Sequence, residues 1–464
     1  MVRLFGRYVP IKSVILAVTE ACLIIVSILL AAWIRFGTIA DTSWYLSRPY
    51  TLIQVALVVL VCWFCLYYNG LYDLQVVARR SQLVVRLMQS LGTAALVLGV
   101  LYYIAPDLSL GRGVGALGAA LIFITFLVWR LTVETGRFFR PVHRVLIAGT
   151  GTGGIRLVRE ILKHPELNLH VVGFLDERGE NIGQPFVNPR IVGGVADIEN
   201  VVRREQVDWV ILAFGERRGV MPTRELLRLK LSGVTIEDAH SLFEKLLGGV
   251  MLERLSASWL VLSEGFRKDF LLMFTKRVLD IVISSITLVL TSPLMLLISS
   301  AILMESGAPV IFRQDRVGLH GRIFRMLKFR SMKNDAENAG ARWASQDDAR
   351  ITWVGRMLRE YRLDELPQLL NVLRGNMSLV GPRPERPEFV GMLGEQIPFY
   401  HERHTVRPGL TGWAQIKYQY GASVGDAKTK LEYELYYIKH LSIFLDLVII
   451  FRTLQVVLSG KGAR

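Results

Sequence analysis

Two adjacent carboxylates, Asp364 and Glu365, lie in a stretch that is rich in arginine. Carboxylate oxygens together with the oxygens of a diphosphate are the usual ligands of Mg²⁺. A carboxylate can also attack phosphorus and carry the phosphoryl group as an acyl phosphate. Arginine forks bind phosphate oxygens and offset the charge of a phosphoryl-transfer transition state. The pair alone is weak evidence for this chemistry, because most Asp-Glu pairs lie on solvated helix faces.

An arginine between two prolines follows the acidic pair, in the run Pro382-Arg383-Pro384. A proline ring fixes its own φ and restricts the residue before it, so the main chain around Arg383 should be rigid. A rigid arginine suits a preorganised phosphate clamp. A bare basic patch would equally suit anionic lipid headgroups, so the residue types alone leave both interpretations open.

Further motifs surround these residues in a fixed order, and together they resemble one family. The resemblance is to the bacterial sugar transferase family, the polyprenyl-phosphate glycosylphosphotransferases (monotopic phosphoglycosyl transferases). It covers about Phe274 to Gly460, and the N-terminal half resembles the large, initiating subgroup, so the whole chain is covered. The motifs are Lys276-Arg277 with Asp280, Ser292-Pro293, Arg316-Val317-Gly318, Phe324–Met332, Arg359 with Arg362, Leu363–Leu373, Gly375–Pro384, Arg407–Gln415, and a tail with Glu434, Tyr437, Ser442 and Asp446.

This resemblance implies a reaction. A sugar 1-phosphate would pass from a UDP-sugar to a polyprenyl phosphate, usually undecaprenyl phosphate, with release of UMP. Asp364 would be the nucleophile, through an aspartyl sugar-phosphate intermediate, and Mg²⁺ would be held by Asp364 and Glu365. The product would feed the synthesis of exopolysaccharide, capsule or O-antigen.

The resemblance also implies a set of binding residues. Arg359 matches the arginine that precedes the dyad by five residues, and Arg383 matches the arginine of Pro-Arg-Pro. The chain departs from the family at Glu434, where many relatives have Asp and the charge is retained, and at Asn376, where Asp is common and one negative charge is lost. We assign substrate binding to Arg359, Arg383, Lys328, Arg330, Lys276, Arg277 and Asp446.

The composition indicates a membrane protein. The chain has 464 residues, and 55 basic against 40 acidic residues give it a net charge of +15. Its mean hydropathy is +0.36. Four apolar runs of about the length that crosses a bilayer occupy the first third: Val14–Ile34, Leu52–Tyr68, Leu83–Ile104 and Val114–Val133.

The arginines and lysines of the loops predict the orientation of these spans. Basic residues precede the first run, separate the second from the third, and follow the fourth; they include Arg3, Arg7, Lys12, Arg79, Arg80, Arg86, Arg137, Arg140 and Arg144. By the positive-inside rule the N-terminus and everything after the fourth span should be cytoplasmic. We therefore expect a multi-pass protein of the bacterial inner membrane with a cytoplasmic active site.

A different pattern begins near residue 144. A buried strand, Val145–Ala148, leads into Gly149, Gly151 and Gly154 and then into a helix. This G-x-G-x-x-G in a strand–turn–helix context is typical of Rossmann-like folds, where the glycines admit a diphosphate to a helix N-terminus. Glycines that only form a tight turn explain the pattern equally well. The alternating helices and strands that follow predict a parallel sheet.

A later apolar segment, Val278–Met304, is long enough to cross the membrane. A fifth crossing would place the basic C-terminal region outside, against the positive-inside rule. Pro293 removes one helix hydrogen bond, so we expect a kink at Ser292-Pro293. A re-entrant helix that bends there and leaves on the same face resolves the conflict; an ordinary kinked span is the alternative.

Together these features predict a multi-domain membrane protein with four transmembrane helices, an α/β Rossmann-like domain and a re-entrant helix with an α-rich catalytic domain. The expected bounds are 1–136, 137–250, a linker at 251–273, and 274–464 with the re-entrant helix at 278–304. Expected partners are a UDP-sugar, undecaprenyl phosphate and the lipid bilayer, without nucleic acid, and a homodimer stays open.

Two rival functions follow from the same features. One is a membrane-anchored nucleotide-sugar dehydratase or epimerase, which usually needs Tyr-x-x-x-Lys beside its cofactor. That spacing occurs here only at Tyr8 and Lys12, before the first span. The other is a non-catalytic, nucleotide-sensing scaffold of a glycan assembly complex, which would have no need of an intact acidic dyad.

Overall fold

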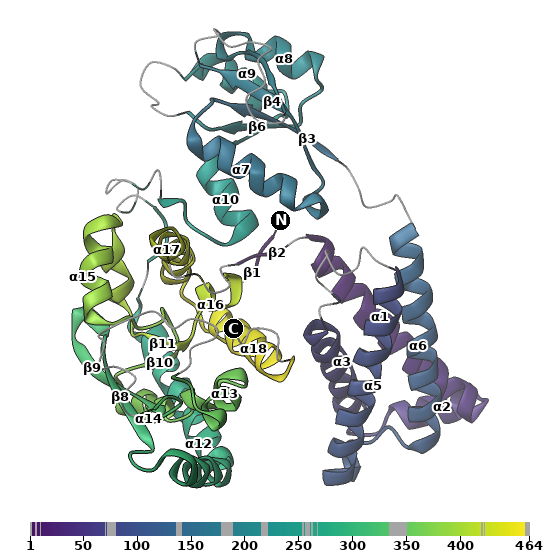
Figure 1. Ribbon diagram of the computed structural model, residues 1–464. Helices are drawn as coiled ribbons and strands as arrows, with labels where there is room; N and C mark the ends of the chain where they lie inside the picture. Colours follow the sequence, from purple (N-terminus) through teal and green to yellow (C-terminus); the bar gives the residue numbers. More distant parts are fainter. Residues whose placement is uncertain are drawn as a thin grey trace.

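The computed structural model shows three units, which Figure 1 displays as a helical bundle, an upper α/β domain and a larger C-terminal domain. The structure describes residues 11–69, 80–135, 142–177, 189–214, 221–252, 268–333, 350–418 and 423–459, together with 2–4, 7–9, 71, 255, 260, 263–266 and 421. Arg79, Arg137 and Arg140, which helped to predict the orientation, lie outside these residues.

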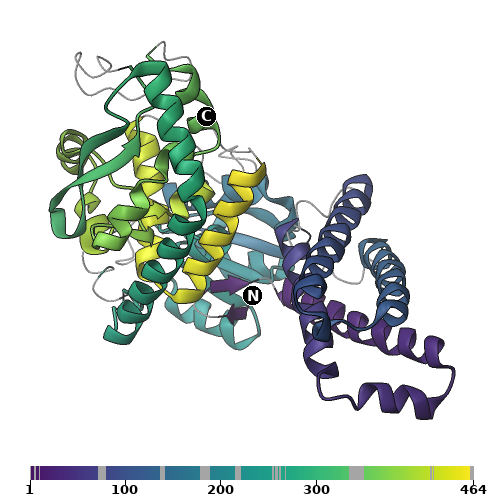
Figure 2. The ribbon, with the colours of Figure 1, turned by 90° about the horizontal axis from the view of Figure 1, so that it is seen from below.

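All four apolar runs of the N-terminal third are helices, and each is long and apolar enough to cross a membrane. Figure 2 shows them grouped apart from the rest of the chain. They are α1 (Ile11–Phe36), α3 (Thr51–Tyr68), α5 (Arg80–Ile104) and α6 (Arg112–Thr135), with the short α2 (Ile39–Leu46) after the first.

One charged pair lies inside this apolar bundle. Arg130 of α6 contacts Glu20 of α1 at 2.6 Å, and both side chains are almost fully buried. Arg130 also donates a hydrogen bond of 2.7 Å to the main-chain oxygen of Leu71. Because each charge has a partner, the pair is tolerated in a medium that would strongly disfavour an isolated ion, and it joins the first and last helices of the bundle.

The middle domain is a five-stranded sheet in the order β5-β4-β3-β6-β7, and every neighbouring pair is parallel, as predicted. Helices α7 and α10 cover the face of this sheet that is turned toward the C-terminal domain, and helices α8 and α9 cover its opposite face (Figure 1). The sequence pattern does not predict β5 or α10. The strands are β3 (His143–Ala148), β4 (Leu169–Asp176), β5 (Ile191–Gly194), β6 (Trp209–Leu212) and β7 (Thr235–Asp238). The helices are α7 (Thr152–Lys163), α8 (Ile198–Arg204), α9 (Thr223–Leu231) and α10 (Ala239–Leu247).

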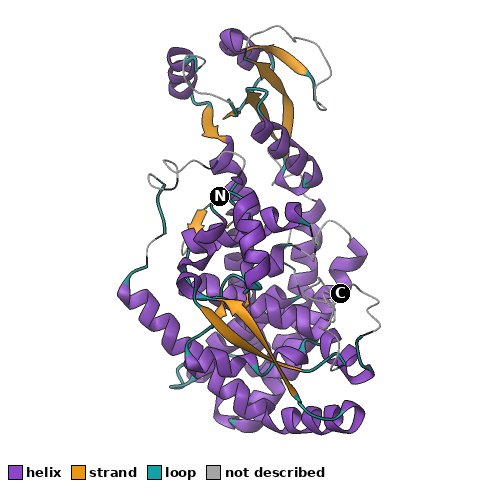
Figure 3. Ribbon diagram, turned by 60° about the vertical axis from the view of Figure 1, so that its left-hand side comes forward, coloured by secondary structure: helices purple, strands orange, loops and turns teal. Residues whose placement is uncertain are grey.

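The C-terminal domain is rich in helices, with two small pairs of strands. Figure 3 shows the longer pair, the antiparallel hairpin of β8 (Ile311–Val317) and β9 (Ile323–Phe329), well separated from the sheet of the middle domain. The other pair is parallel, β10 (Ser378–Val380) with β11 (Gly409–Thr411). The helices are α12 (Phe270–Ser306), α13 (Trp353–Glu360), α14 (Gln368–Arg374), α15 (Pro387–Gln396), α16 (Trp413–Lys417), α17 (Val424–Lys439) and α18 (Ile443–Ser459).

The predicted membrane segment at 278–304 lies within the longer helix α12, which continues through Pro293. Proline cannot donate to the main-chain oxygen of Val289, four residues before it. The hydroxyl of Ser292 donates to that oxygen instead, at 2.8 Å. The serine therefore replaces the hydrogen bond that the proline removes, which explains why the helix is not interrupted at this point.

The two ends of α12 are fixed to the same C-terminal domain. Near its start, Lys276 is buried against Asp446 of α18 at 2.6 Å, and Arg277 donates to the carbonyls that end α14. At its other end, Glu305 accepts hydrogen bonds from the first main-chain N–H groups of α13. The middle of the helix exposes apolar side chains: Ile286, Val289, Leu290, Leu296 and Leu297.

The middle domain contacts the C-terminal domain through α17. Arg156 of α7 forms two hydrogen bonds of 2.6 Å with the buried carboxylate of Glu432. Glu244 of α10 forms an ion pair with Lys439 near the C-terminal end of α17, and it also contacts the ring nitrogen Nε2 of His440. The expected linker begins with Met251 in the core of the middle domain and Leu252 in that of the C-terminal domain, so it joins the two cores directly.

We expect Asp446→Asn to destabilise the protein by roughly 3–5 kcal/mol, because it leaves the Lys276 cation buried without its counter-charge. The temperature at which half of the detergent-solubilised protein aggregates should fall clearly. Asp315→Asn is the matched control, since Asp315 pairs with Arg325 at 3.9 Å on the surface, where both side chains are mostly exposed and little stability is at stake. Equal midpoints for the two variants would contradict this role of the buried pair.

Candidate active site

The acidic dyad lies in a short 3₁₀ turn, η7 (Leu363–Glu365), between α13 and α14. Arg362 begins this turn with a φ of +54°, a left-handed conformation that non-glycine residues seldom adopt. Leu363 and Leu366 flank the dyad and pack against a cluster that contains Ile298 and Ile302 of α12. The dyad is therefore held directly beside the C-terminal half of the apolar helix.

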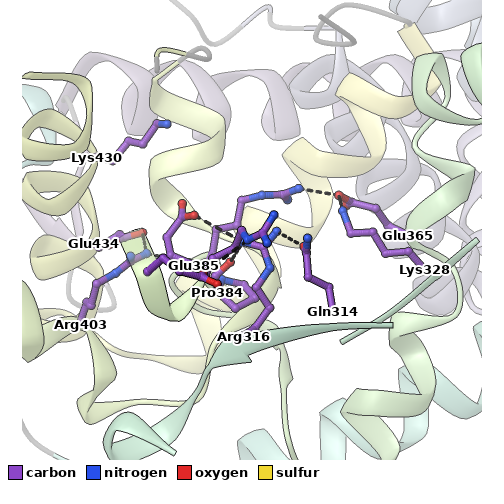
Figure 4. Close-up of polar contacts among 12 residues, drawn as sticks. Gln314, Arg316, Lys328, Glu365, Pro384, Glu385, Arg403, Lys430 and Glu434 are labelled. Atoms are coloured by element: carbon purple, nitrogen blue, oxygen red, sulfur yellow. Dashed lines mark hydrogen bonds and ion pairs between the residues drawn. The ribbon is translucent and has the colours of Figure 1, made fainter. Parts of the chain in front are cut away.

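Two cations share one oxygen of Glu365. Arg383 donates to Glu365 Oε1 at 2.7 Å, and Lys328 donates to the same atom at 3.3 Å (Figure 4). Burial opposes ionisation of Glu365, but the nearby charges of Arg383 and Lys328 outweigh it and hold the pKa of this carboxyl well below its usual range. The two cations therefore favour the ionised form of Glu365, and its Oε1 accepts a hydrogen bond from each of them.

Asp364 has a different environment. Within the part of the chain that the structure describes, its carboxylate accepts no hydrogen bond and forms no ion pair, and only 8% of the residue is exposed. Burial raises the pKa of Asp364; Lys328, Arg359 and Arg383 oppose this shift, and Glu365 adds to it. A poorly solvated carboxylate beside three cations is well suited to attack an electron-poor centre in an anionic substrate.

Lys328 is positioned by the main chain of β9. The buried side chain of Asn371, on α14, accepts a hydrogen bond from the N–H of Leu327 and donates one to the carbonyl of Arg325. The opposite strand pairs Phe312 with Lys328. Hydrogen bonds to Asn371 and to β8 therefore hold the main chain of β9 next to Lys328.

Arg359 lies on α13, one turn before the dyad. Its Nε donates to the hydroxyl of Ser331 at 3.0 Å, and its charge lowers the pKa of Asp364. The structure therefore brings together five of the predicted site residues: Asp364, Glu365, Lys328, Arg359 and Arg383.

Four other predicted substrate-binding residues hold α12 in place. Lys276 donates to Asp446, to the hydroxyl of Tyr437 and to a carbonyl of β10. Arg277 bonds the last carbonyls of α14, where a cation is favourable. Arg330 is buried and donates to Ser306 and Gly307 at the C-terminal end of α12. These contacts give each residue a structural role, and substrate binding by them stays a prediction.

Two of the three glycines predicted to bind a cofactor are explained by packing. Gly149 has a φ of +109°, and a Cβ there would lie 2.8 Å from the main chain of Ala213. A Cβ on Gly154 would meet the side chain of Ala213 at 2.7 Å. Gly151 is the residue before the first turn of α7. The close approach of β3, α7 and β6 requires Gly149 and Gly154 whether or not a nucleotide binds.

Two arginines support the main chain around Arg383 and are not among the predicted site residues: Arg403 and Arg316. Arg403 donates to the carbonyl of Arg383 and to Glu434, and Arg316 donates to the carbonyl of Pro384. Arg316 stood in a recognised motif, and Glu434 was noted only as a departure from the family. Arg403 lies in a run of mixed polar residues that carries no periodic signal.

The oxygen atoms of Asp364 and Glu365 can be compared with the ligands that Mg²⁺ requires. Both cations bond Oε1 of Glu365, which leaves Oε2 and the carboxylate of Asp364 without a hydrogen bond from the described residues. No cluster of three or more histidine, cysteine, aspartate or glutamate side chains occurs in the described ranges. Two carboxylates fit Mg²⁺ when substrate phosphates complete its shell, so the residues are compatible with this ion.

Comparison with known protein families gives two matches. Residues 271–460 match the family described as bacterial sugar transferase, and this range contains the dyad and every cation around it. Residues 67–225 match a family described as CoA-binding domain, which covers most of the sheet of the middle domain.

The chain is also similar to individual curated proteins. It is 43% identical over 241 residues to a UDP-N-acetylgalactosamine-undecaprenyl-phosphate N-acetylgalactosaminephosphotransferase of Aeromonas hydrophila, covering 52% of this chain and 56% of that protein. It is 33% identical to a UDP-glucose:undecaprenyl-phosphate glucose-1-phosphate transferase of Klebsiella pneumoniae, over 72% of this chain and 75% of the relative. A protein of the same name from Xanthomonas campestris pv. campestris is 30% identical, over 99% of this chain and 96% of its own length.

We expect turnover to require the ionised carboxylate of Asp364. Because its pKa is raised, this group takes up a proton at a higher pH than an ordinary aspartate, whose pKa is about 3.9. The rate should therefore fall as the pH drops through the raised pKa. Lys328→Met removes the charge that most strongly lowers this pKa, so the acid limb of the pH–rate profile should move to higher pH.

Lys163→Met serves as the control for this profile, because Lys163 lies on the surface of α7 and pairs only with Glu160 in the described structure. Its acid limb should coincide with that of the unaltered protein. An acid limb that does not move in Lys328→Met would show that Asp364 is not the titrating group.

Proposed function

This chain belongs to the bacterial sugar transferase family, and we propose that it transfers a sugar 1-phosphate from a UDP-sugar to undecaprenyl phosphate. The observation that carries the proposal is the contrast within the dyad: Glu365 is held by two cations, whereas Asp364 has no partner among the described residues. The names of the relatives support the same donor and acceptor. The product would start the assembly of an exopolysaccharide, a capsule or an O-antigen.

In the first step, an oxygen of Asp364 attacks the β-phosphorus of the UDP-sugar. The bond from this phosphorus to the bridging oxygen breaks, and UMP leaves with the electron pair. Arg383 and Lys328 offset the charge that develops on the transferring phosphoryl group. Glu365 fixes the positions of both cations through its Oε1.

In the second step, an oxygen of the lipid phosphate attacks the same phosphorus and releases the Asp364 carboxylate. The two anionic substrates thus react one after the other and need not approach each other directly. The packing of Leu363 and Leu366 beside α12 supports this order, because it puts the intermediate next to the helix along which a lipid phosphate would arrive.

Asp364 and Glu365 are the residues that would hold Mg²⁺. When bound, this ion supplies charge neutralisation at the diphosphate oxygens and orients them. The negative neighbour and the burial that raise the pKa of Asp364 are the conditions under which a divalent cation would favour the ionised carboxylate.

We further propose that α12 is re-entrant and that the active site faces the cytoplasm. Both ends of the helix bind one domain, through Lys276 at its start and Glu305 at its end. A helix that crossed the bilayer completely would separate these two anchors by the full membrane thickness. The exposed apolar side chains in the middle of α12 supply the surface that lipid would cover.

The middle domain, in this proposal, assembles or tunes the enzyme and supplies no catalytic group. Its described residues contact the catalytic domain through α17, and the reacting carboxylates lie elsewhere. Nucleotide binding at Gly149, Gly151 and Gly154 stays a prediction.

The covalent step can be tested by trapping the intermediate. Incubation with a UDP-sugar labelled in the sugar, without lipid acceptor, should place the label on the peptide that contains Asp364, as mapped by mass spectrometry. Asp364→Asn should abolish the label and slow UMP release by roughly 10⁴-fold, because the amide is not a nucleophile. The exposed Asp315→Asn variant should label like the unaltered protein. Absence of any adduct, with kinetics that require both substrates bound together, would refute the mechanism.

The topology can be tested with a membrane-impermeant maleimide on spheroplasts, in a background without the three native cysteines. Ile39→Cys, which is 80% exposed between the first two spans, should be labelled from outside. Leu231→Cys in the middle domain and Asp315→Cys beyond α12 should both be protected until the membrane is opened. Labelling of Asp315→Cys alone from outside would mean that α12 crosses the membrane.

A further inference from the structure

The main chain that carries Arg383 is held at four consecutive carbonyl groups. The oxygens of Pro382 and Glu385 accept hydrogen bonds from the main-chain N–H groups of Gly409 and Val317, at 2.8 and 3.0 Å. The two oxygens between them accept from arginine side chains, of which Arg403 is buried and Arg316 partly buried: Arg403 to Arg383 at 2.7 Å, and Arg316 to Pro384 at 3.0 Å (Figure 4). With two prolines in the same run, this segment has little remaining freedom.

Burial of the Arg403 guanidinium carries a large desolvation penalty. Only 4% of this residue is exposed, and its fork is divided among the carbonyl of Arg383, the hydroxyl of Tyr400 at 2.6 Å and the carboxylate of Glu434 at 2.7 Å. Glu434 is itself 5% exposed. A buried ion pair of this kind seldom stabilises a fold more than apolar side chains of the same volume would, so stability alone is a poor explanation for it.

The pair connects to the dyad through a single residue. Arg403 bonds the main chain of Arg383, and the side chain of Arg383 bonds Glu365 at 2.7 Å. Among the described residues, Arg403 bonds Tyr400, Arg383 and Glu434 and does not bond the dyad itself. Arg403 belongs to η8 (Tyr400–Thr405), while Glu434 comes from α17. The geometry therefore defines a support behind the clamp, built from two elements that contribute nothing else to it.

We propose that Arg403, anchored by Glu434, is a positioning residue that fixes the guanidinium of Arg383 for the transferring phosphoryl group. The proposal rests on the proposed function, because Arg383 must act on that group for its position to matter. A displacement of about 1 Å at a catalytic group can cost up to ~10²-fold in rate. Loss of the support should therefore lower kcat while leaving KM for the UDP-sugar nearly unchanged.

The test is a double-mutant cycle in the full-length protein. Arg403→Lys keeps the charge opposite Glu434 but loses the planar fork, whose Nη1 bonds Tyr400 and whose Nη2 is thereby directed at both Arg383 O and Glu434. It should reduce kcat for UMP release roughly 10- to 100-fold. In an Arg383→Ala background the same change should cost less than about 3-fold, because there is no longer a guanidinium to position. Equal losses in both backgrounds would overturn the proposal.

Glu432→Gln is the matched control. Glu432 is a buried carboxylate on the same helix, α17, and it pairs with Arg156 away from the clamp. Its effect should be the same with and without Arg383, so a general loss of stability is separated from loss of positioning. If Arg403→Lys does not accumulate, Glu434→Gln takes its place in the cycle, and Glu434→Asp, which retains the charge, should restore most of kcat.

A readout that needs no turnover separates this inference from the proposed function. The Arg383 side chain is 28% exposed and held by Glu365, so it should react slowly with phenylglyoxal, as mapped by mass spectrometry. Arg403→Lys should speed this reaction several-fold, and Glu432→Gln should not. Unchanged reactivity of Arg383 overturns the positioning role. Absence of UMP release from the unaltered protein with every UDP-sugar overturns the function and leaves the reactivity result to decide the inference.

Discussion

The burial of an acidic dyad beside an apolar membrane helix is the constraint on which the rest of the C-terminal domain depends. Burial takes water from a carboxylate, and nearby cations and hydrogen bonds offset the cost in free energy. Arg383 and Lys328 do this for Glu365 through direct bonds, and they also lie close enough to Asp364 to lower its pKa. Those cations must in turn be held, and each has its own support: Asn371 fixes the strand of Lys328, and Arg403 and Arg316 fix the loop of Arg383. The layers of polar residues around the dyad follow from one electrostatic requirement.

Helix α17 connects this arrangement to the middle domain. Glu432 pairs with Arg156 of the middle domain, and Glu434 pairs with Arg403 behind the clamp. Residues two apart on a helix point to different sides, so α17 lies between the two domains with one carboxylate directed to each. The contact with the middle domain and the support of Arg383 are therefore carried by the same helix of 16 residues, through different carboxylates.

The long helices, the parallel sheet and the dyad with Arg383 could be predicted because each has a local signal. These signals can be recognised in the sequence alone: apolar runs of membrane length, a glycine-rich strand–turn–helix pattern and a fixed order of motifs. β5 escaped notice because it is only four residues long and ends in two glycines, which weaken strand propensity. Arg403 escaped because its meaning lies in partners at positions 383 and 434, which only the folded chain brings together.

Charge near a motif is ambiguous in sequence, and the structure adds the partners of each charged side chain, while substrate binding by these residues stays a prediction. Lys276, Arg277 and Arg330 were assigned to substrate because cations bind phosphate, yet their donors bond a buried carboxylate, helix carbonyls and a serine. A cation whose hydrogen bonds are satisfied inside the protein would have to break them to bind a ligand, and each lost bond to a charged group costs about 1.5–3 kcal/mol. Asp364 stands at the other extreme, with no partner among the described residues. The proposed nucleophile is thus the carboxylate that has no partner among the described residues, while the charges around it are paired with other groups.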